Sequence, residues 1–299
     1  MPTVTAVPVV LRAPSPPPEW PPDVLAGLLS CDTKTTGAAT MTAAGARARS
    51  ANATWHPAIE SCPGSSSVCR GDCYAWRLER CRPSVRDAAA RRLALWDDAI
   101  RAGDGADLAA ALIRHVRADA VRRGILPTFR IHASGDFHSA GYVDAWRDGG
   151  RMVAADDGPP VRVWTYSRSY GSAGRDLLAR LLDGDGFPPA GWSVYLSADA
   201  GMVDRARNAV AGIYHRLPVA VMADDAAHGA DLLRRIRATD ARPDAGIGVT
   251  RRALTCPVVP GGMPIVTERR GRLVGACHHC RACLPANAAT APDIVFPIH

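Results

Sequence analysis

Lysine is almost absent from this chain, and so are long apolar runs and export signals. Only Lys34 among the 36 lysine and arginine residues is a lysine. No apolar stretch reaches the roughly 20 residues that span a bilayer, and the first residues lack the charged start, apolar core and cleavage site of a signal peptide. These absences predict a cytoplasmic protein without a membrane segment.

Nucleotide-binding signatures are missing as well, whereas cysteine is plentiful. The sequence contains neither a P-loop nor a lone G-x-G-x-x-G. Its nine cysteines, in a chain expected to stay in the reducing cytosol, indicate metal ligation or redox chemistry rather than disulfides. We predict a proline-rich arm over 1–22, a βα-repeat domain with a cysteine loop over 23–250, and a cysteine-rich metal-binding segment over 251–299.

Three cysteines fall close together in a loop rich in glycine and serine. Cys62, Cys69 and Cys73, called here the first cysteine group, have the spacing C-x6-C-x3-C. Such a loop has too little apolar surface to order itself, and its small residues let the backbone wrap around a metal centre. The sequence leaves open whether Cys81 or Cys31 supplies a fourth ligand.

A second set of cysteines lies near the C-terminus. The second cysteine group consists of Cys256, Cys277, Cys280 and Cys283. Its C-x2-C-x2-C run with a remote Cys-Pro resembles the ligand run of [4Fe-4S] ferredoxins, whereas zinc sites usually pair two separate C-x2-C arms. We therefore expect one or two [4Fe-4S] clusters, with zinc or unmetallated cysteines as alternatives.

Short β-rich runs alternate with helix-like segments at the spacing of βα units, which predicts a parallel sheet with right-handed crossovers. The expected strands cover residues 23–31, 128–133, 161–166, 192–197, 217–222 and 245–249. Helices are expected from Ser84, which resembles the start of a capping box, to Ile100, and over 106–123. Six strands favour an α/β fold with an open (β/α)6 partial barrel, TIM-barrel-like, over a doubly wound sheet.

Polar side chains gather where these strands are expected to end, and parallel α/β folds place their chemistry there. Arg130 and His132 are catalytic candidates, because strand alternation would point both into the barrel mouth. Ser134, Gly135 and Asp136 form a turn that offers a carboxylate and bare backbone to a cofactor, and Asp136 is a catalytic candidate as well. The alternatives are a structural histidine at 132 and a helix-capping role for Asp136.

Three further residues complete the expected site. Tyr166 and Arg168, at the end of the next strand, are candidates for cofactor binding, and Lys34 is a candidate for catalysis. A lysine that survives among arginines supplies a compact point charge for an anion, although chance survival is equally open.

The formal charge of +7 includes a local basic patch near the second cysteine group. The patch consists of Arg251, Arg252, Arg269, Arg270 and Arg272. It is either a solvated face or a contact for nucleic acid.

A thiolate loop, a helix and a strand that ends in a Gly-acid turn follow one another in this chain. This order resembles that of radical S-adenosylmethionine (radical SAM) enzymes. The resemblance implies that the first cysteine group holds three irons of a cluster whose fourth iron binds S-adenosylmethionine. It also implies that Gly135 and Asp136 stand where the family binds the amine of that ligand. The family's usual spacing is C-x3-C-x2-C and its turn carries Glu, so the chain departs from both patterns.

More closely, the sequence is similar to the uncharacterised phage gene-product-eighty-eight-like family. The shared marks are DTKT, the CP…C…CYA loop, FRIHASGDFHSAGYVDAW, WTYSRS and the terminal CP…CHHCRAC. This resemblance spans about residues 30–285 and implies a phage-infected or prophage-bearing host. Two functions remain open: a radical-SAM-like metalloenzyme, or a non-catalytic iron–sulfur or zinc protein that binds nucleic acid or a host protein.

Overall fold

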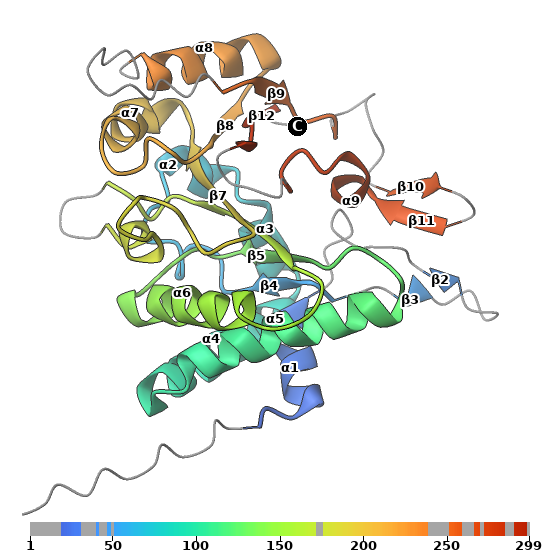
Figure 1. The fold of residues 1–299 in the computed structure, drawn as a ribbon. Helices are drawn as coiled ribbons and strands as arrows, with labels where there is room; N and C mark the ends of the chain where they lie inside the picture. Colours follow the sequence, from blue (N-terminus) through green and yellow to red (C-terminus); the bar gives the residue numbers. More distant parts are fainter. Residues whose placement is uncertain are drawn as a thin grey trace, which may run out of the picture.

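The chain is built on one eight-stranded sheet (Figure 1). The computed structural model describes residues 19–30, 40–41, 47–48, 51–171, 176–238, 251–258, 266–269, 272–284 and 290–297. In spatial order the strands of the sheet are β1 (Leu29–Ser30), β4 (Ala53–Trp55), β5 (Thr128–Ser134), β6 (Arg162–Ser167), β7 (Trp192–Ala198), β8 (Val219–Ala223), β12 (Asp293–Pro297) and β9 (Ala253–Thr255). Two further pairs are β2 (Thr40–Met41) with β3 (Arg47–Ala48), and β10 (Val266–Arg269) with β11 (Arg272–Gly275).

Six strands of the sheet are parallel and lie side by side in chain order. They are β4, β5, β6, β7, β8 and β12. At the edges, β1 is antiparallel to β4, and β9 lies outside β12. The order does not reverse between β4 and β12, whereas a doubly wound sheet reverses at its switch point. The fold is therefore mixed α/β with a mostly parallel sheet that does not close on itself.

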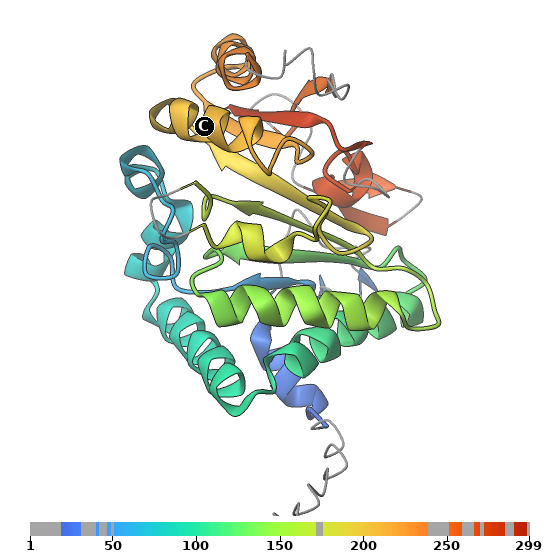
Figure 2. The same cartoon turned by 60° about the vertical axis from the view of Figure 1, so that its left-hand side comes forward.

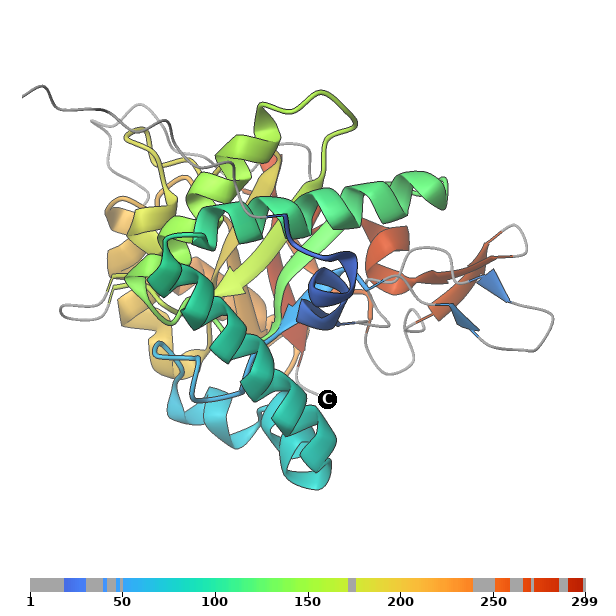
Figure 3. The same cartoon turned by 90° about the horizontal axis from the view of Figure 1, so that it is seen from below.

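Helices lie on both faces of this sheet and at the carboxyl ends of its strands, and most of them pack into the main core on one face. They are α1 (Pro22–Leu28), α2 (Ser67–Gly71), α3 (Tyr74–Cys81), α4 (Pro83–Ala102), α5 (Gly105–Arg122), α6 (Ala140–Ala154), α7 (Val203–Ala211), α8 (Ala226–Arg237) and α9 (Ala276–Cys280), with 3₁₀ turns η1 (Leu178–Leu181) and η2 (Ala200–Met202). Figures 1 and 2 show α4, α5 and α6 together against the sheet. Figure 3 shows the β10–β11 hairpin projecting away from the body of the sheet.

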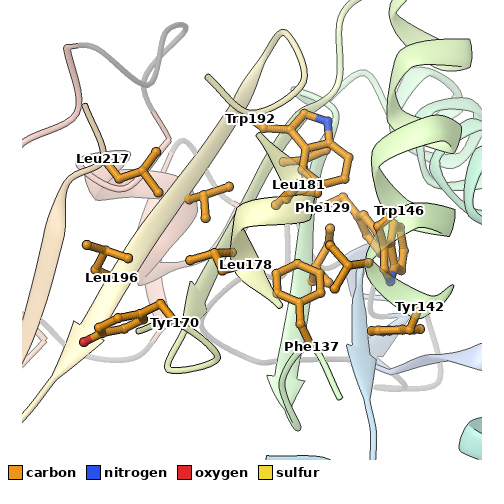
Figure 4. Packing of buried hydrophobic residues seen from close by; sticks show 14 of the residues in the cluster. Phe129, Phe137, Tyr142, Trp146, Tyr170, Leu178, Leu181, Trp192, Leu196 and Leu217 are labelled. Atoms are coloured by element: carbon orange, nitrogen blue, oxygen red, sulfur yellow. The ribbon is translucent and has the colours of Figure 1, made fainter. Parts of the chain in front are cut away.

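Strand alternation separates two apolar clusters. Val163, Val194 and Val221 point into the main core with the helices. In that core, the rings of Phe129 on β5 and Trp146 on α6 lie 5.6 Å apart (Figure 4). Tyr195 points from the opposite face, where Tyr166 and residues of the C-terminal segment pack against it. That segment is part of the sheet, because it contributes β9 and β12.

Comparison with the sequence shows which local signals hold. The strands expected at 128–133, 161–166, 192–197 and 217–222 are confirmed as β5 to β8, and the helix over 106–123 as α5. The strand expected at 23–31 is wrong, because Pro22 begins helix α1 and β1 has two residues. The capping box at Ser84 is also wrong, because Pro83 begins α4 and no side chain caps it. The strand expected at 245–249 lies outside the described residues.

Candidate functional site

The first cysteine group lies at the carboxyl ends of the parallel strands, beside α2 and α3. Ser66 is the N-cap of α2 and accepts a hydrogen bond from the backbone N–H of Cys69 (3.0 Å). Cys73 is the N-cap of α3, and its Sγ accepts the backbone N–H of Trp76 (3.4 Å). Capping bonds fix a side chain relative to its helix. The two short helices therefore fix the positions of Cys69 and Cys73.

The three thiols are close enough to act on one another electrostatically. Burial raises the pKa of Cys62 to about 12, and the charge of Asp136 adds to this rise. The thiolates of Cys69 and Cys73 raise the pKa of Cys62 as well. Burial also raises the pKa of Cys69, against the opposing effect of the Arg168 guanidinium. A cation bound among these thiols would offset the shifts, because it favours the thiolate form.

Two glycines let the cysteine loop pack directly on the strand ends. A Cβ at Gly64 would lie 1.9 Å from the carbonyl oxygen of Arg168. Arg205 holds this contact by donating from Nη2 to the carbonyls of Gly64 (2.8 Å) and Arg168 (3.1 Å). At Gly135, φ is +89° and a Cβ would lie 2.6 Å from Ser61 Oγ. Both positions therefore require glycine, the second for conformation as well as space.

Asp136 is buried and ties the ends of β5 and β6 together. Its Oδ1 accepts the backbone N–H of Phe137, and its Oδ2 accepts that of Arg168, each at 2.7 Å. The N-cap of α6 is Ser139, which accepts from the backbone N–H of Tyr142 (3.3 Å), so the capping alternative for Asp136 is wrong. Asp136 acts on the site by holding the turn and by placing negative charge beside the thiols.

Arg168 supplies a buried positive charge to the same place. Its Nη1 pairs with the carboxylate of Asp199 and lies 3.2 Å from Ser66 Oγ and 3.1 Å from Met202 Sδ. Ser66 also donates to Asp199. Asp199 was not among the expected site residues, although it follows β7 as Asp136 follows β5. The strand-end position was the signal that could have identified it.

His132 and Arg130 do not share a face of β5. His132 has φ of 64° where the pairing of β4 with β5 shifts register, so its ring turns toward the helices. There its Nδ1 lies 3.3 Å from Thr165 Oγ1 and its Nε2 lies 3.1 Å from the Tyr142 hydroxyl. Arg130 lies on the opposite face, with its guanidinium 5.8 Å from the centre of the Tyr166 ring. The alternation prediction is therefore wrong, and His132 has the structural role held open as its alternative.

The second cysteine group also converges, from three separate places in the chain. Cys256 follows β9, Cys277 and Cys280 lie on α9, and Cys283 lies in the turn after it. Burial raises the pKa of Cys283 to about 12, a hydrogen bond from Tyr166 lowers it, and the other three thiolates raise it. Tyr166 therefore belongs with the second group, not with Arg168 and the first.

Backbone strain concentrates at these sites. Within the described residues, the non-glycine residues with positive φ are Ile59 (69°), His132 (64°) and Arg281 (58°). Ile59 precedes Cys62, His132 precedes the Asp136 turn, and Arg281 lies inside the C-terminal cysteine run. Such conformations cost about 1–3 kcal/mol each, and all three lie close in sequence to a cysteine group or to the Asp136 turn.

Several expected residues fall elsewhere. Cys31, Lys34 and Arg270 lie outside the described residues, as do the side chains of Arg269 and Arg272. In the basic patch, Arg251 donates to the backbone carbonyls of Arg216 and Ala291, whereas Arg252 is exposed. Arg251 therefore has an internal structural role.

Cys81 does not join the first cysteine group. It is the exposed last residue of α3, and Cys73 caps the other end of that helix. At 1.5 Å per residue, the eight residues of α3 separate the two cysteines by about 12 Å. Among the described side chains, no three histidines, cysteines or acidic residues are placed to hold a single metal ion. No described helix is long and apolar enough to cross a membrane.

Comparisons with known proteins agree on one relationship. Over 147 residues, the chain is 34% identical to the Gene 88 protein of Mycobacterium phage L5. This match covers 49% of the chain and 56% of that protein. It is 33% identical over the same length to the Gene 88 protein of Mycobacterium phage D29, covering 55% of it. The match thus spans little more than half of each relative. No solved structure matches the chain.

These relatives support the expected bacteriophage origin. Residues 28–286 match the sequence profile of the Gene product 88 family, which is most of the chain. The chain belongs to the Gene product 88 family.

Proposed function

We propose that this protein is an iron–sulfur enzyme of the radical-SAM-like type. The first cysteine group would hold a [4Fe-4S] cluster with one iron open to a small ligand, and the second cysteine group would hold another cluster. One observation carries the proposal: three thiols, with no fourth cysteine beside them in the described residues, converge at the carboxyl edge of six parallel strands in chain order.

The chemistry of the donors fits a cluster better than a single ion. Thiolates are the usual ligands of [4Fe-4S] clusters. Zinc–sulfur bonds of about 2.3 Å require tetrahedral ligands about 3.8 Å apart. The described cysteines are not placed to hold a single ion, yet they act on one another electrostatically. A four-iron core is wider than one ion and spaces its thiolates farther apart, so it does not need the close ligand spacing of a zinc site.

The buried charges around the first group support a bound cationic core. Three thiolates and the carboxylates of Asp136 and Asp199 would accumulate negative charge in one buried region. Arg168 supplies one compensating charge, which leaves the irons to supply the rest. When bound, the cluster would supply an electron to a ligand at its open iron.

The chain's own residues offer a place for that ligand. The Ser134 hydroxyl is buried without a hydrogen-bond partner among the described residues, and it adjoins the Gly135 turn. Buried polar groups rarely lack a partner, so a polar ligand at this edge would satisfy it. S-adenosylmethionine is the candidate for this ligand, and only the resemblance to radical SAM enzymes suggests it. Asp136 would orient the turn, since both of its oxygens already accept backbone N–H groups.

The test begins with anaerobic purification and analysis of iron, sulfide and zinc. We expect iron and sulfide, with brown protein absorbing near about 400 nm. Adding S-adenosylmethionine to the reduced protein should change the electron paramagnetic resonance of one cluster. That change should weaken in Ser134→Ala, whose iron content should be intact.

Two results would oppose the proposal at different levels. Colourless protein with stoichiometric zinc would replace it by the zinc-protein alternative. An intact, reduced cluster whose spectrum ignores millimolar S-adenosylmethionine would leave an iron–sulfur protein but exclude this ligand.

A further inference from the structure

Asp199 connects the end of β7 to the first cysteine group. It is buried, and its two carboxylate oxygens have different partners. Oδ1 accepts the backbone N–H of Gly201 (3.0 Å), which caps the 3₁₀ turn η2. Oδ2 accepts from the hydroxyl of Ser66 and from Nη1 of Arg168. One oxygen therefore stabilises the local turn, and the other binds the cysteine loop and its neighbouring arginine.

Ser66 links this carboxylate to Cys69. Its hydroxyl donates to Asp199, and its oxygen accepts the backbone N–H of Cys69 at 3.0 Å. Nη1 of Arg168 lies 3.2 Å from the same oxygen. A serine hydroxyl has one proton and two lone pairs, so these three bonds satisfy it completely. Two hydrogen bonds therefore join the buried carboxylate to the backbone of Cys69.

Arg168 gives Asp199 a second role, through charge. The Arg168 guanidinium is buried, and Asp199 is the acid that pairs with it in the described part of the chain. The same guanidinium reaches Ser66 Oγ, so the ion pair lies directly beside the loop that carries Cys69. Removing the carboxylate alone would leave an uncompensated positive charge there. Asp199 therefore controls the net charge beside the first cysteine group.

We infer that Asp199 is a positioning residue that holds Cys69 in place through Ser66 and makes the reduction potential of the first cluster more negative; this rests on the proposed function. When the cluster takes up one electron it gains negative charge, and no bond forms or breaks. A carboxylate beside it opposes that gain. Net charge is one of the factors that set the potentials of such clusters.

The experiment is a redox titration of the full chain with dithionite, followed by electron paramagnetic resonance. The signal of the first cluster is identified as the one that Cys73→Ser removes. In Asp199→Asn its midpoint should become more positive by about tenfold in the reduction equilibrium, which is about 59 mV for one electron.

Asp293→Asn is the matched control for this titration. Asp293 is also buried and pairs with an arginine, Arg237, at 2.8 Å. It is the first residue of β12, however, whereas Asp199 follows the last residue of β7, so the two acids lie at opposite ends of parallel strands. The control should leave the midpoint unchanged, because it removes a similar ion pair far from the first group.

A second measurement covers the case in which Asp199→Asn loses the cluster. An amide has one acceptor oxygen, so this variant cannot bind both the η2 turn and the cysteine loop. In the metal-free chain, iodoacetamide should then label Cys69 about tenfold faster than in Asp293→Asn, the effect of losing one charge-assisted hydrogen bond. The exposed Cys81 is the internal reference, and its labelling should not change.

Two outcomes would oppose the inference. Equal midpoints in Asp199→Asn and Asp293→Asn, or equal labelling of Cys69 if the cluster is lost, would overturn it and leave the proposed function standing. Zinc in place of iron at the first group would overturn both.

Discussion

Gly64 lies against the backbone of Arg168, so that even a methyl group at Gly64 would lie 1.9 Å from the Arg168 carbonyl oxygen. This contact joins the cysteine loop to the end of β6. Since the obstacle is backbone, it cannot move aside as a flexible side chain could. The position of the first cysteine group therefore depends on one missing Cβ.

We predict that Gly64→Ala weakens iron binding at the first group and destabilises the protein by about 1–3 kcal/mol, the usual cost of overpacking. Gly71→Ala is the matched control, because nothing lies within 4 Å of a Cβ there. In helix α2 this control should be neutral or stabilising by up to about 1 kcal/mol. Urea unfolding and iron analysis of both variants test the prediction, and equal behaviour would contradict it.

Cys73→Ser should remove the iron of the first cluster, whereas Cys81→Ser should retain it. The reason is position: Cys73 lies among the interacting thiols, while Cys81 is exposed at the far end of α3. Iron content and the visible spectrum after anaerobic purification measure the difference. Loss of iron in Cys81→Ser, with the fold intact by circular dichroism, would make Cys81 a ligand and close the open iron.

The two cysteine groups should load independently. The thiolates that act on Cys62 belong to the first group, and those that act on Cys283 belong to the second. Cys277→Ser should therefore remove about half of the iron and leave the response to S-adenosylmethionine. Loss of all the iron from a folded chain would instead indicate a shared cluster.

Stability should fall when the pH drops below about 6.5, partly because of His56. The pKa of His56 is lowered to about 3, mainly by burial and also by positive charge at His138 and Arg92. Between about pH 6.5 and about pH 3 the unfolded chain binds a proton at this site that the folded chain does not. Each such group costs about 1.4 kcal/mol per pH unit in that window.

Urea unfolding at several values between about pH 7 and pH 5 measures this slope. In His56→Leu the slope should be shallower by about one proton, whereas His115→Gln, a partly exposed position on α5, should keep it. An identical slope in His56→Leu would show that other groups cause the acid sensitivity.

Local sequence signals predicted the central strands but not the edges of the sheet. Residues 128–133 and 192–197 have uninterrupted β-rich patterns, and both form strands. β4 has only three residues, too few to show the alternation of apolar and polar residues that predicts a strand. Its place in the sheet therefore depends on its pairing with β1 and β5. The segment at 23–31 is apolar enough for a strand, but Pro22 favours a helix start and the packing of Leu25 and Leu28 completes it.

The candidate site was predictable where one residue type determines the chemistry. Cysteine spacing defined both groups as candidates, and the members of each group lie close enough in the structure to act on one another. The face of β5 on which His132 lies was not predictable. A single positive φ turns the side chain to the other face, and no local sequence pattern predicts that bulge. Tyr166 was assigned to the wrong group for a related reason: its partner Cys283 is more than a hundred residues away in sequence.

The place of β12 has a consequence for biosynthesis. β12 lies between β8 and β9, although both precede it in the chain. Until β12 has been synthesised, β8 presents an unpaired edge, and β9 has no strand to join. Since Cys256 follows β9 and α9 precedes β12, the ligands of the second group come together only as the sheet is completed. Assembly of the cluster proposed for this group would therefore report the end of folding.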